Sequence, residues 1–133
     1  MVHTQKRFDR LIELMETEPI IACDFETDSL NVDEAKVVGL VIYFDLDRSF
    51  YVPVGHKVDE HMNLSMDHLK ILLDMLSKKT TVWFNWAYDG HVLKMLGYNI
   101  DEWEYIDMMP TMWLTDTNWK ENSLKWYEKH NRS

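Results

Sequence analysis

The chain has 133 residues, of which 14 are basic and 23 acidic, and its formal net charge is −9. This length predicts a single domain over residues 1–133, and the negative charge excludes a protein that binds nucleic acid tightly through a basic surface of its own. One cysteine excludes an internal disulfide, and the lack of a long apolar run predicts no membrane span, so we expect a cytoplasmic protein, or one in a host's cytoplasm if it is viral.

The first predicted elements are an amphipathic helix and a buried strand. Apolar residues recur at helical spacing in residues 7–16, and Pro19 precedes an unbroken apolar run at residues 20–23. Asp24 and Glu26 follow at the exit of this strand, and residues two apart in a strand project from one face. Because two carboxylates this close resist joint ionisation, we predict a metal site; the alternative is a strand end whose acids are only solvated.

Two further strands are predicted at residues 36–44 and 49–54, which are rich in β-branched and aromatic side chains. A polar loop at residues 31–34 precedes them and a turn at residues 45–48 joins them. Because these connections are short, we predict an antiparallel meander in which neighbouring strands pair directly.

The loop at residues 55–63 contains His56 and His61. No further Cys or His cluster nearby completes a tetrahedral set, so we expect histidines that lie at the surface or face a substrate rather than bind zinc.

Helices and strands alternate through the rest of the chain. Ser65 is predicted to cap a helix that runs to residue 77, and Lys78 and Lys79 suit its carboxyl end. The later elements predicted are a strand, a helix that Gly97 ends, a short strand and two helical segments, at residues 80–85, 87–96, 104–107, 108–115 and 123–129.

The segment NWAYD at residues 85–89 is a second candidate site because a strand passes into a helix there, and such junctions host ligands in α/β sheets. Asn85 and Tyr88 suit holding a sugar and phosphate, while Asp89 would complete a metal shell. The alternative makes Asn85 a turn residue and Asp89 a charge at a helix start.

Together these segments resemble a known family. DFETDSL at residues 24–30 is similar to the first motif, and NWAYD to the second motif, of the proofreading 3′-5′ exonuclease domain of family A DNA polymerases, in the DEDD exonuclease superfamily. FYVPVGH at residues 50–56 and DMMPTMWL at residues 107–114 are similar to the strand and loop between the motifs and to the acidic strand end and helix that follow. The resemblance implies an α/β, ribonuclease H-like fold with a mixed five-stranded sheet flanked by helices.

The resemblance also implies a two-metal site. Asp24 would bridge two Mg²⁺ or Mn²⁺ ions, Glu26 would hold the first ion and its water, and Asp89 would support the second. Such a pair of ions activates water and stabilises the leaving 3′ oxygen in an in-line displacement.

Four residues would contact the 3′ end of single-stranded DNA. The resemblance implies that Thr27 and Leu30 contact the terminal nucleotide, and that Asn85 and Tyr88 border the strand end.

In the family, the third motif, Tyr-x-x-x-Asp, supplies a fourth carboxylate from a helix well downstream of the one that Ser123 and Leu124 resemble, and the chain stops before it. Residues 127–131, YEKHN, have the motif's spacing, but Asn131 replaces the acid and the register fits the earlier helix better. We therefore expect a domain that is incomplete at its C-terminus, is weak or inactive alone, and is completed by the remaining polymerase polypeptide. The alternatives are a catalytically incomplete module that acts through protein contacts, and an exonuclease on RNA or oligonucleotides, against which FYVPVGH argues.

Large apolar side chains gather in the last third of the chain, including Trp103, Trp113, Trp119 and Trp126. Either they complete the core, or they leave a surface for self-association or for the polymerase fragment. We predict association through the last three of these tryptophans.

Overall fold

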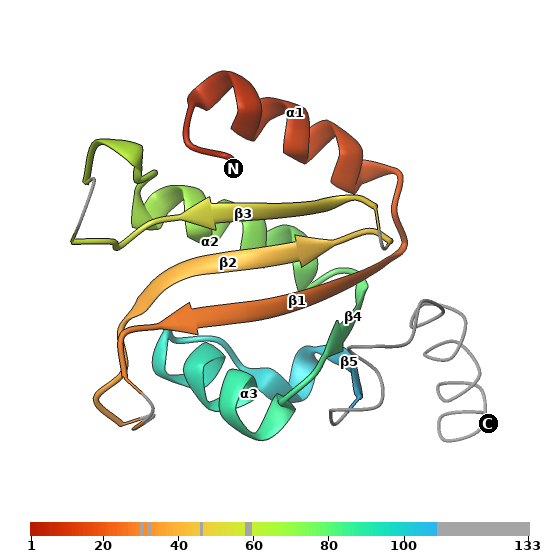
Figure 1. The fold of residues 1–133 in the computed structure, drawn as a ribbon. Helices are drawn as coiled ribbons and strands as arrows, with labels where there is room; N and C mark the ends of the chain where they lie inside the picture. Colours follow the sequence, from red (N-terminus) through yellow and green to blue (C-terminus); the bar gives the residue numbers. More distant parts are fainter. Residues whose placement is uncertain (30, 32, 46, 58–59, 109–133) are drawn as a thin grey trace.

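The computed structural model describes residues 1–108 apart from residues 30, 32, 46, 58 and 59. Its centre is one five-stranded sheet with the strand order β3-β2-β1-β4-β5 (Figure 1). The strands are β1 (Ile20–Thr27), β2 (Val37–Tyr43), β3 (Ser49–Pro53), β4 (Thr80–Trp83) and β5 (Glu104–Asp107). β1, β2 and β3 pair antiparallel, as the short connections predicted, whereas β4 and β5 run parallel to β1. The predicted α/β class and the mixed five-stranded sheet are therefore confirmed.

The helices begin and end close to the residues that the sequence predicted. They are α1 (Gln5–Glu16), α2 (Met66–Leu76) and α3 (Trp86–Met95), with two short 3-10 helices, η1 (Glu60–Met62) and η2 (Ile100–Glu102), that the sequence analysis did not include. The Ser65 hydroxyl accepts a hydrogen bond from the backbone of His68, which confirms this residue as the cap of α2. Gly97 follows α3 with a φ of 98°, a conformation that residues with a Cβ rarely adopt.

The larger core joins the three helices to one face of the sheet. Leu11 of α1, Leu72 of α2 and Leu93 of α3 are buried in one cluster with Ile21 and Cys23 of β1. The cysteine is thus a small buried side chain in the core, as expected.

The opposite face of the sheet carries a second, smaller cluster. Its buried members alternate along the strands with members of the larger core, and they are Ile20, Ala22, Val82, Phe84, Ile106 and Met108, with Tyr43 packed against them. Within the described residues, no side chain of α1, α2 or α3 takes part in this cluster. Asp24 and Glu26 continue the same face beyond Ala22, because alternate residues of β1 share a face.

The strand that carries the acids continues past its apolar run. Residues 20–23 are the apolar part of β1, and β1 continues to Thr27, so Asp24 and Glu26 lie on the first strand as the sequence analysis implied. The reason is that β2 pairs with β1 from Ala22 to Thr27, while β4 pairs only with Ile20 to Cys23. The acids therefore lie on a strand that has lost its neighbour on one side.

Several predictions fall outside the described residues. They concern the helical segments beyond residue 108 and the side chains of Trp113, Trp119 and Trp126. Of the apolar group in the last third of the chain, Trp103 and Met108 are described, and both are buried. No helix among the described residues is long and apolar enough to cross a membrane.

Candidate active site

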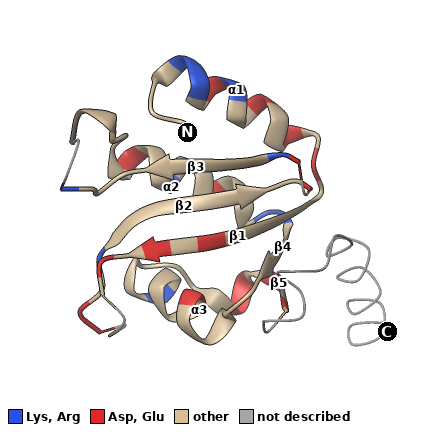
Figure 2. Cartoon of the chain, in the orientation of Figure 1, with Lys and Arg blue, Asp and Glu red and all other residues tan. Residues whose placement is uncertain are grey.

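Asp24 and Glu26 form the acidic end of β1 (Figure 2). Asp24 is half-buried and Glu26 is exposed. Burial raises the pKa of Asp24 to about 6, and the charge of Glu26 adds to the rise. The two carboxylates thus influence each other electrostatically, and the Asp24 carboxyl group is harder to ionise than an ordinary aspartate.

Asp89 lies in the first turn of α3 and is only 1% exposed. Burial raises its pKa to about 8, with further contributions from the charges of Asp24 and Asp107, whereas a hydrogen bond from the backbone of Phe25 lowers it. Its Oδ2 atom has no hydrogen-bond partner among the described residues. Because nearly all buried polar atoms have a partner, we expect a proton or a cation to bind this oxygen. The alternative in which Asp89 is merely a charge at a helix start does not account for such burial.

The end of β4 explains how Asp89 reaches β1. β4 stops at Trp83, which pairs with Cys23, so the backbone of β1 beyond Cys23 has no strand beside it on that side. The chain then enters α3, whose first turn brings the Asp89 carboxylate to the amide of Phe25. A strand pairing that ends early therefore places Asp89 near Asp24.

These acids suit a hard divalent cation, which prefers oxygen ligands. The orphaned Oδ2 of Asp89 and the mutual repulsion of Asp24 and Glu26 both favour a bound positive charge. Among residues 1–108 as described, however, no three acidic, histidine or cysteine side chains are grouped closely enough to hold a metal ion. An ion would therefore need these acidic side chains to move closer together, or a further ligand from outside the described residues.

Asp107 is an acid of this site that the sequence analysis did not select. It ends β5, its Oδ1 atom accepts a hydrogen bond of 3.4 Å from the backbone of Trp86, and its charge raises the pKa of Asp89. The signal for it was available, because the carboxyl ends of parallel strands meet at one edge of a sheet and Asp107 is the last residue of such a strand.

The residues expected at the DNA strand end lie beside the acids. The hydroxyl groups of Thr27 and Tyr88 are hydrogen-bonded to each other, and both contact the carbonyl oxygen of Ser29, at 3.0 and 2.8 Å. Asn85 is the N-cap residue of α3 but its exposed side chain makes no capping hydrogen bond, so its amide is not used by the helix. Leu30 lies outside the described residues.

Comparisons with known proteins show which family this sequence resembles. The sequence profile of a 3′-5′ exonuclease family matches residues 1–125. DNA polymerase I of Borreliella burgdorferi is 29% identical over 119 residues, which make up 90% of this chain and 13% of that protein. The chain therefore spans about an eighth of the length of this relative.

Two solved structures share the fold. The EXO domain of Aedes aegypti Nibbler superposes with a TM-score of 0.53 and 10% identity, over 98% of this chain and 56% of that chain. Escherichia coli RNase D, an exoribonuclease involved in structured RNA processing, superposes with a TM-score of 0.50 and 16% identity, over 73% of this chain and 24% of that chain. At these identities the similarity concerns the fold, and it confirms the predicted ribonuclease H-like architecture.

Proposed function

The chain belongs to the 3′-5′ exonuclease family, as its two motifs predicted, and from this premise we propose that Asp24, Glu26 and Asp89 bind Mg²⁺ or Mn²⁺ for the removal of nucleotides from the 3′ end of single-stranded DNA. Two bound ions would supply an activated water and stabilise the leaving 3′ oxygen. The chain's own contribution is to hold three carboxylates near the end of β1. The 3′ end of an extended DNA strand would bind at this place.

One observation supports this proposal most directly. Asp89 is buried beside Asp24, and its Oδ2 atom has no partner among the described residues. A carboxylate in this position is unfavourable when ionised unless a positive charge lies next to it. A purely structural role would not need a second acid so close, which favours the nuclease over a module that acts only through protein contacts.

The substrate contacts follow from the same edge of the sheet. We propose that Thr27 and Tyr88, which are linked through their hydroxyl groups, support the sugar of the terminal nucleotide, and that the free amide of Asn85 contacts its phosphate. Leu30 would pack against the terminal base, as the family resemblance implies.

The choice of DNA and the need for a partner rest on the sequence relative. This relative is a DNA polymerase I, and a net charge of −9 supplies little affinity for a phosphate backbone. We therefore propose that a polymerase polypeptide contributes both the fourth carboxylate and most of the DNA affinity. Association through Trp113, Trp119 and Trp126, with such a polypeptide or with a second copy, is part of this proposal.

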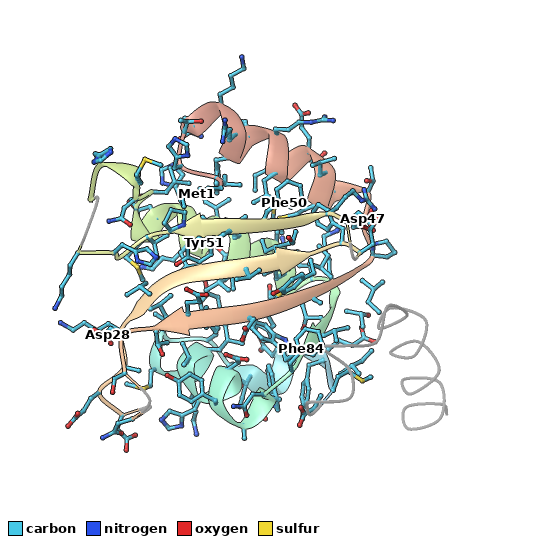
Figure 3. The ribbon with its side chains drawn as sticks, viewed as in Figure 1. Met1, Asp28, Asp47, Phe50, Tyr51 and Phe84 are labelled. Carbon is cyan, nitrogen blue, oxygen red and sulfur yellow. The ribbon has the colours of Figure 1, made fainter. Side chains whose placement is uncertain are left out.

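The experiment measures how the chain binds a fluorescent single-stranded oligonucleotide, by anisotropy with and without Mn²⁺. We expect Mn²⁺ to strengthen binding of an oligonucleotide with a free 3′ end at least threefold in the wild type and to have no effect in Asp24→Asn. An RNA strand of the same sequence should bind less well. The matched control is Asp47→Asn. Asp28, which lies two residues after Glu26, marks the end of the sheet with the candidate site, and Asp47 lies at the opposite end (Figure 3).

Two outcomes contradict the proposal. One is Mn²⁺-dependent binding that Asp24→Asn and Asp89→Asn leave unchanged, because the ion would then bind elsewhere. The other is a blunt duplex, whose 3′ ends are base-paired, that binds as tightly as the single strand with a free 3′ end. Tighter binding of the RNA strand would indicate that the substrate is RNA and would refute the proposal that it is DNA.

A further inference from the structure

A tyrosine outside the family motifs quoted for catalysis contacts the acidic end of β1, and a histidine is hydrogen-bonded to this tyrosine. We infer that Tyr51 and His56 are positioning residues that hold the Glu26 carboxylate in the orientation required for metal binding. This inference rests on the proposed function in one respect, since it takes Glu26 to be a metal ligand.

The register of the sheet places Tyr51 on the face that carries the acids. Tyr51 of β3 pairs with Val41 of β2, and Val41 pairs with Asp24 of β1. Residues paired in this way project from the same face of a sheet. Tyr51 therefore shares a face with Asp24 and Glu26, although β2 lies between its own strand and theirs (Figure 3).

The absence of a side chain at Gly39 leaves space for the Tyr51 ring to extend across β2. Gly39 pairs with Glu26 on one side and with Pro53 on the other. A Cβ atom added to Gly39 would lie 2.1 Å from the Tyr51 hydroxyl oxygen and 2.3 Å from its Cζ atom, so the phenol ring lies directly over this glycine. A side chain of any size at this position would block the ring. Glycine is therefore required here for space, and its result is a phenol that extends from β3 toward β1.

The Tyr51 hydroxyl makes two hydrogen bonds at the end of this path. One is to the Glu26 carboxylate and the other is to Nε2 of His56. An ionised carboxylate only accepts hydrogen bonds, so the phenol donates its single proton to Glu26 and accepts a hydrogen bond from the Nε2–H of His56.

His56 is itself fixed by the loop that follows β3. The Asn63 side chain accepts a hydrogen bond of 3.1 Å from the His56 amide and donates one of 2.8 Å to the His56 carbonyl. The imidazole meets the tyrosine ring edge to face, with centroids 5.6 Å apart. Both ends of the histidine are therefore held, and the histidine in turn fixes the phenol. This arrangement gives the His56 side chain a defined contact within the fold.

The consequence concerns a flexible ligand. Glu26 is exposed, and an exposed glutamate loses side-chain entropy when it is ordered around an ion. A hydrogen bond from Tyr51 to one carboxylate oxygen orders the side chain in advance and leaves the other oxygen free for the ion. Hydrogen bonds of this kind to metal ligands typically change metal affinity by about 10- to 100-fold when they are removed.

The experiment is a calorimetric titration of the full chain with Mn²⁺ alone, at fixed pH. We expect Tyr51→Phe, which removes only the hydroxyl group, to weaken Mn²⁺ binding about tenfold while the metal-free protein stays folded and loses no more than about 1 kcal/mol of stability. Gly39→Ala should weaken binding similarly, because the added methyl group displaces the phenol while the tyrosine hydroxyl is retained. His56→Gln keeps an N–H donor and should lose less affinity than His56→Ala.

Tyr43→Phe is the matched control. Tyr43 lies on the same face, and burial and the charges of Asp24 and Glu26 raise its pKa, but among the described residues its hydroxyl makes no hydrogen bond to either acid. This control should bind Mn²⁺ within twofold of the wild type. Wild-type affinity in Tyr51→Phe overturns the inference, and so does an equal loss in Tyr43→Phe, which would indicate a general effect of the face.

The same titration separates this inference from the proposed function. If Glu26→Gln and Asp24→Asn weaken Mn²⁺ binding and Tyr51→Phe does not, the metal site stands and the positioning role is wrong. If neither acid variant changes Mn²⁺ binding, the metal site itself is wrong, and the positioning role fails with it.

Discussion

The hydroxyl groups of Thr27 and Tyr88 form a hydrogen bond that ties the end of β1 to the first turn of α3, across 61 residues of sequence. Both residues also contact the carbonyl oxygen of Ser29, two residues beyond the end of the strand. The two acidic motifs are thus connected by side chains that come from the motifs themselves. The connection fixes the position of Asp89, the next residue after Tyr88, relative to Asp24 and Glu26.

The first prediction removes this connection. Tyr88→Phe should lower the free energy of unfolding by about 1 kcal/mol, the usual cost of a lost hydrogen bond, and weaken binding of single-stranded DNA severalfold. Affinity for Mn²⁺ should stay within twofold, because Tyr88 is not a metal ligand. Chemical denaturation and anisotropy measure these effects, with Tyr105→Phe as the control, since Tyr105 is exposed. Unchanged DNA binding in Tyr88→Phe would show that this hydroxyl group does not serve the substrate.

The second prediction concerns pH. The pKa of Asp89 is raised to about 8 in the folded protein, against an ordinary value of 3.8. Between these values the folded state keeps a proton that the unfolded state has released, so the stability of the metal-free protein should fall as the pH rises from about 4 to 8 and should level off above 8. One pKa unit corresponds to about 1.4 kcal/mol, so the whole shift would correspond to about 6 kcal/mol. We expect about half of this, on the order of 3 kcal/mol, because the folded protein relaxes around a buried charge.

Unfolding curves of wild type and Asp89→Asn over this pH range measure the effect. Asp89→Asn should remove most of the fall and be more stable than the wild type at pH 8, whereas Asp47→Asn should follow the wild type. Saturating Mn²⁺ should also reduce the fall, since a bound cation stabilises the ionised acid. Parallel curves for wild type and Asp89→Asn would refute the raised pKa.

A third prediction concerns hydrolysis by the chain alone. Residues 127–131 have the spacing of the family's third motif but carry Asn131 instead of an acid. We therefore expect trimming of a 5′-labelled oligonucleotide to be slow or undetectable in Mn²⁺, because the loss of one carboxylate from a metal cluster removes much of its transition-state stabilisation. Gel analysis of the products measures this rate. Rapid trimming that Asp24→Ala abolishes would show that another group takes the place of the fourth acid.

A fourth prediction tests the end of α3. Gly97 has a φ of 98° and open space around it, so Gly97→Ala should lower the free energy of unfolding by about 1 kcal/mol through backbone strain alone. Gly97→Asn should cost less, because asparagine tolerates this conformation. Equal stability of the alanine variant and the wild type in chemical denaturation would show that the turn rearranges without strain.

Local patterns predicted the elements of this fold well because the deciding interactions are short in range. The Ser65 cap and the turn between β2 and β3 involve residues at most a few positions apart. How far β1 extends past its apolar run depends instead on a distant segment. The polar end of β1 remains a strand because β2 pairs with it, and that pairing is not visible in the residues of β1 alone.

The candidate site follows the same rule. Asp24, Glu26 and Asp89 were selected from short motifs, and the structure brings their charges together. The contact of Tyr51 with Glu26 could not be predicted, because it depends on the register of three strands and on the space above Gly39. The segments beyond residue 108 lie outside the described residues, so association through the C-terminal tryptophans stays a prediction.

The most direct measurement of the central claim is an anomalous difference map from crystals of the chain soaked in MnCl₂. The account predicts a Mn²⁺ peak in contact with the carboxylates of Asp24 and Glu26, next to Oδ2 of Asp89, and predicts that this peak is lost in crystals of Asp24→Asn. Mn²⁺ bound only elsewhere on the protein, with no peak at these three acids, would contradict it.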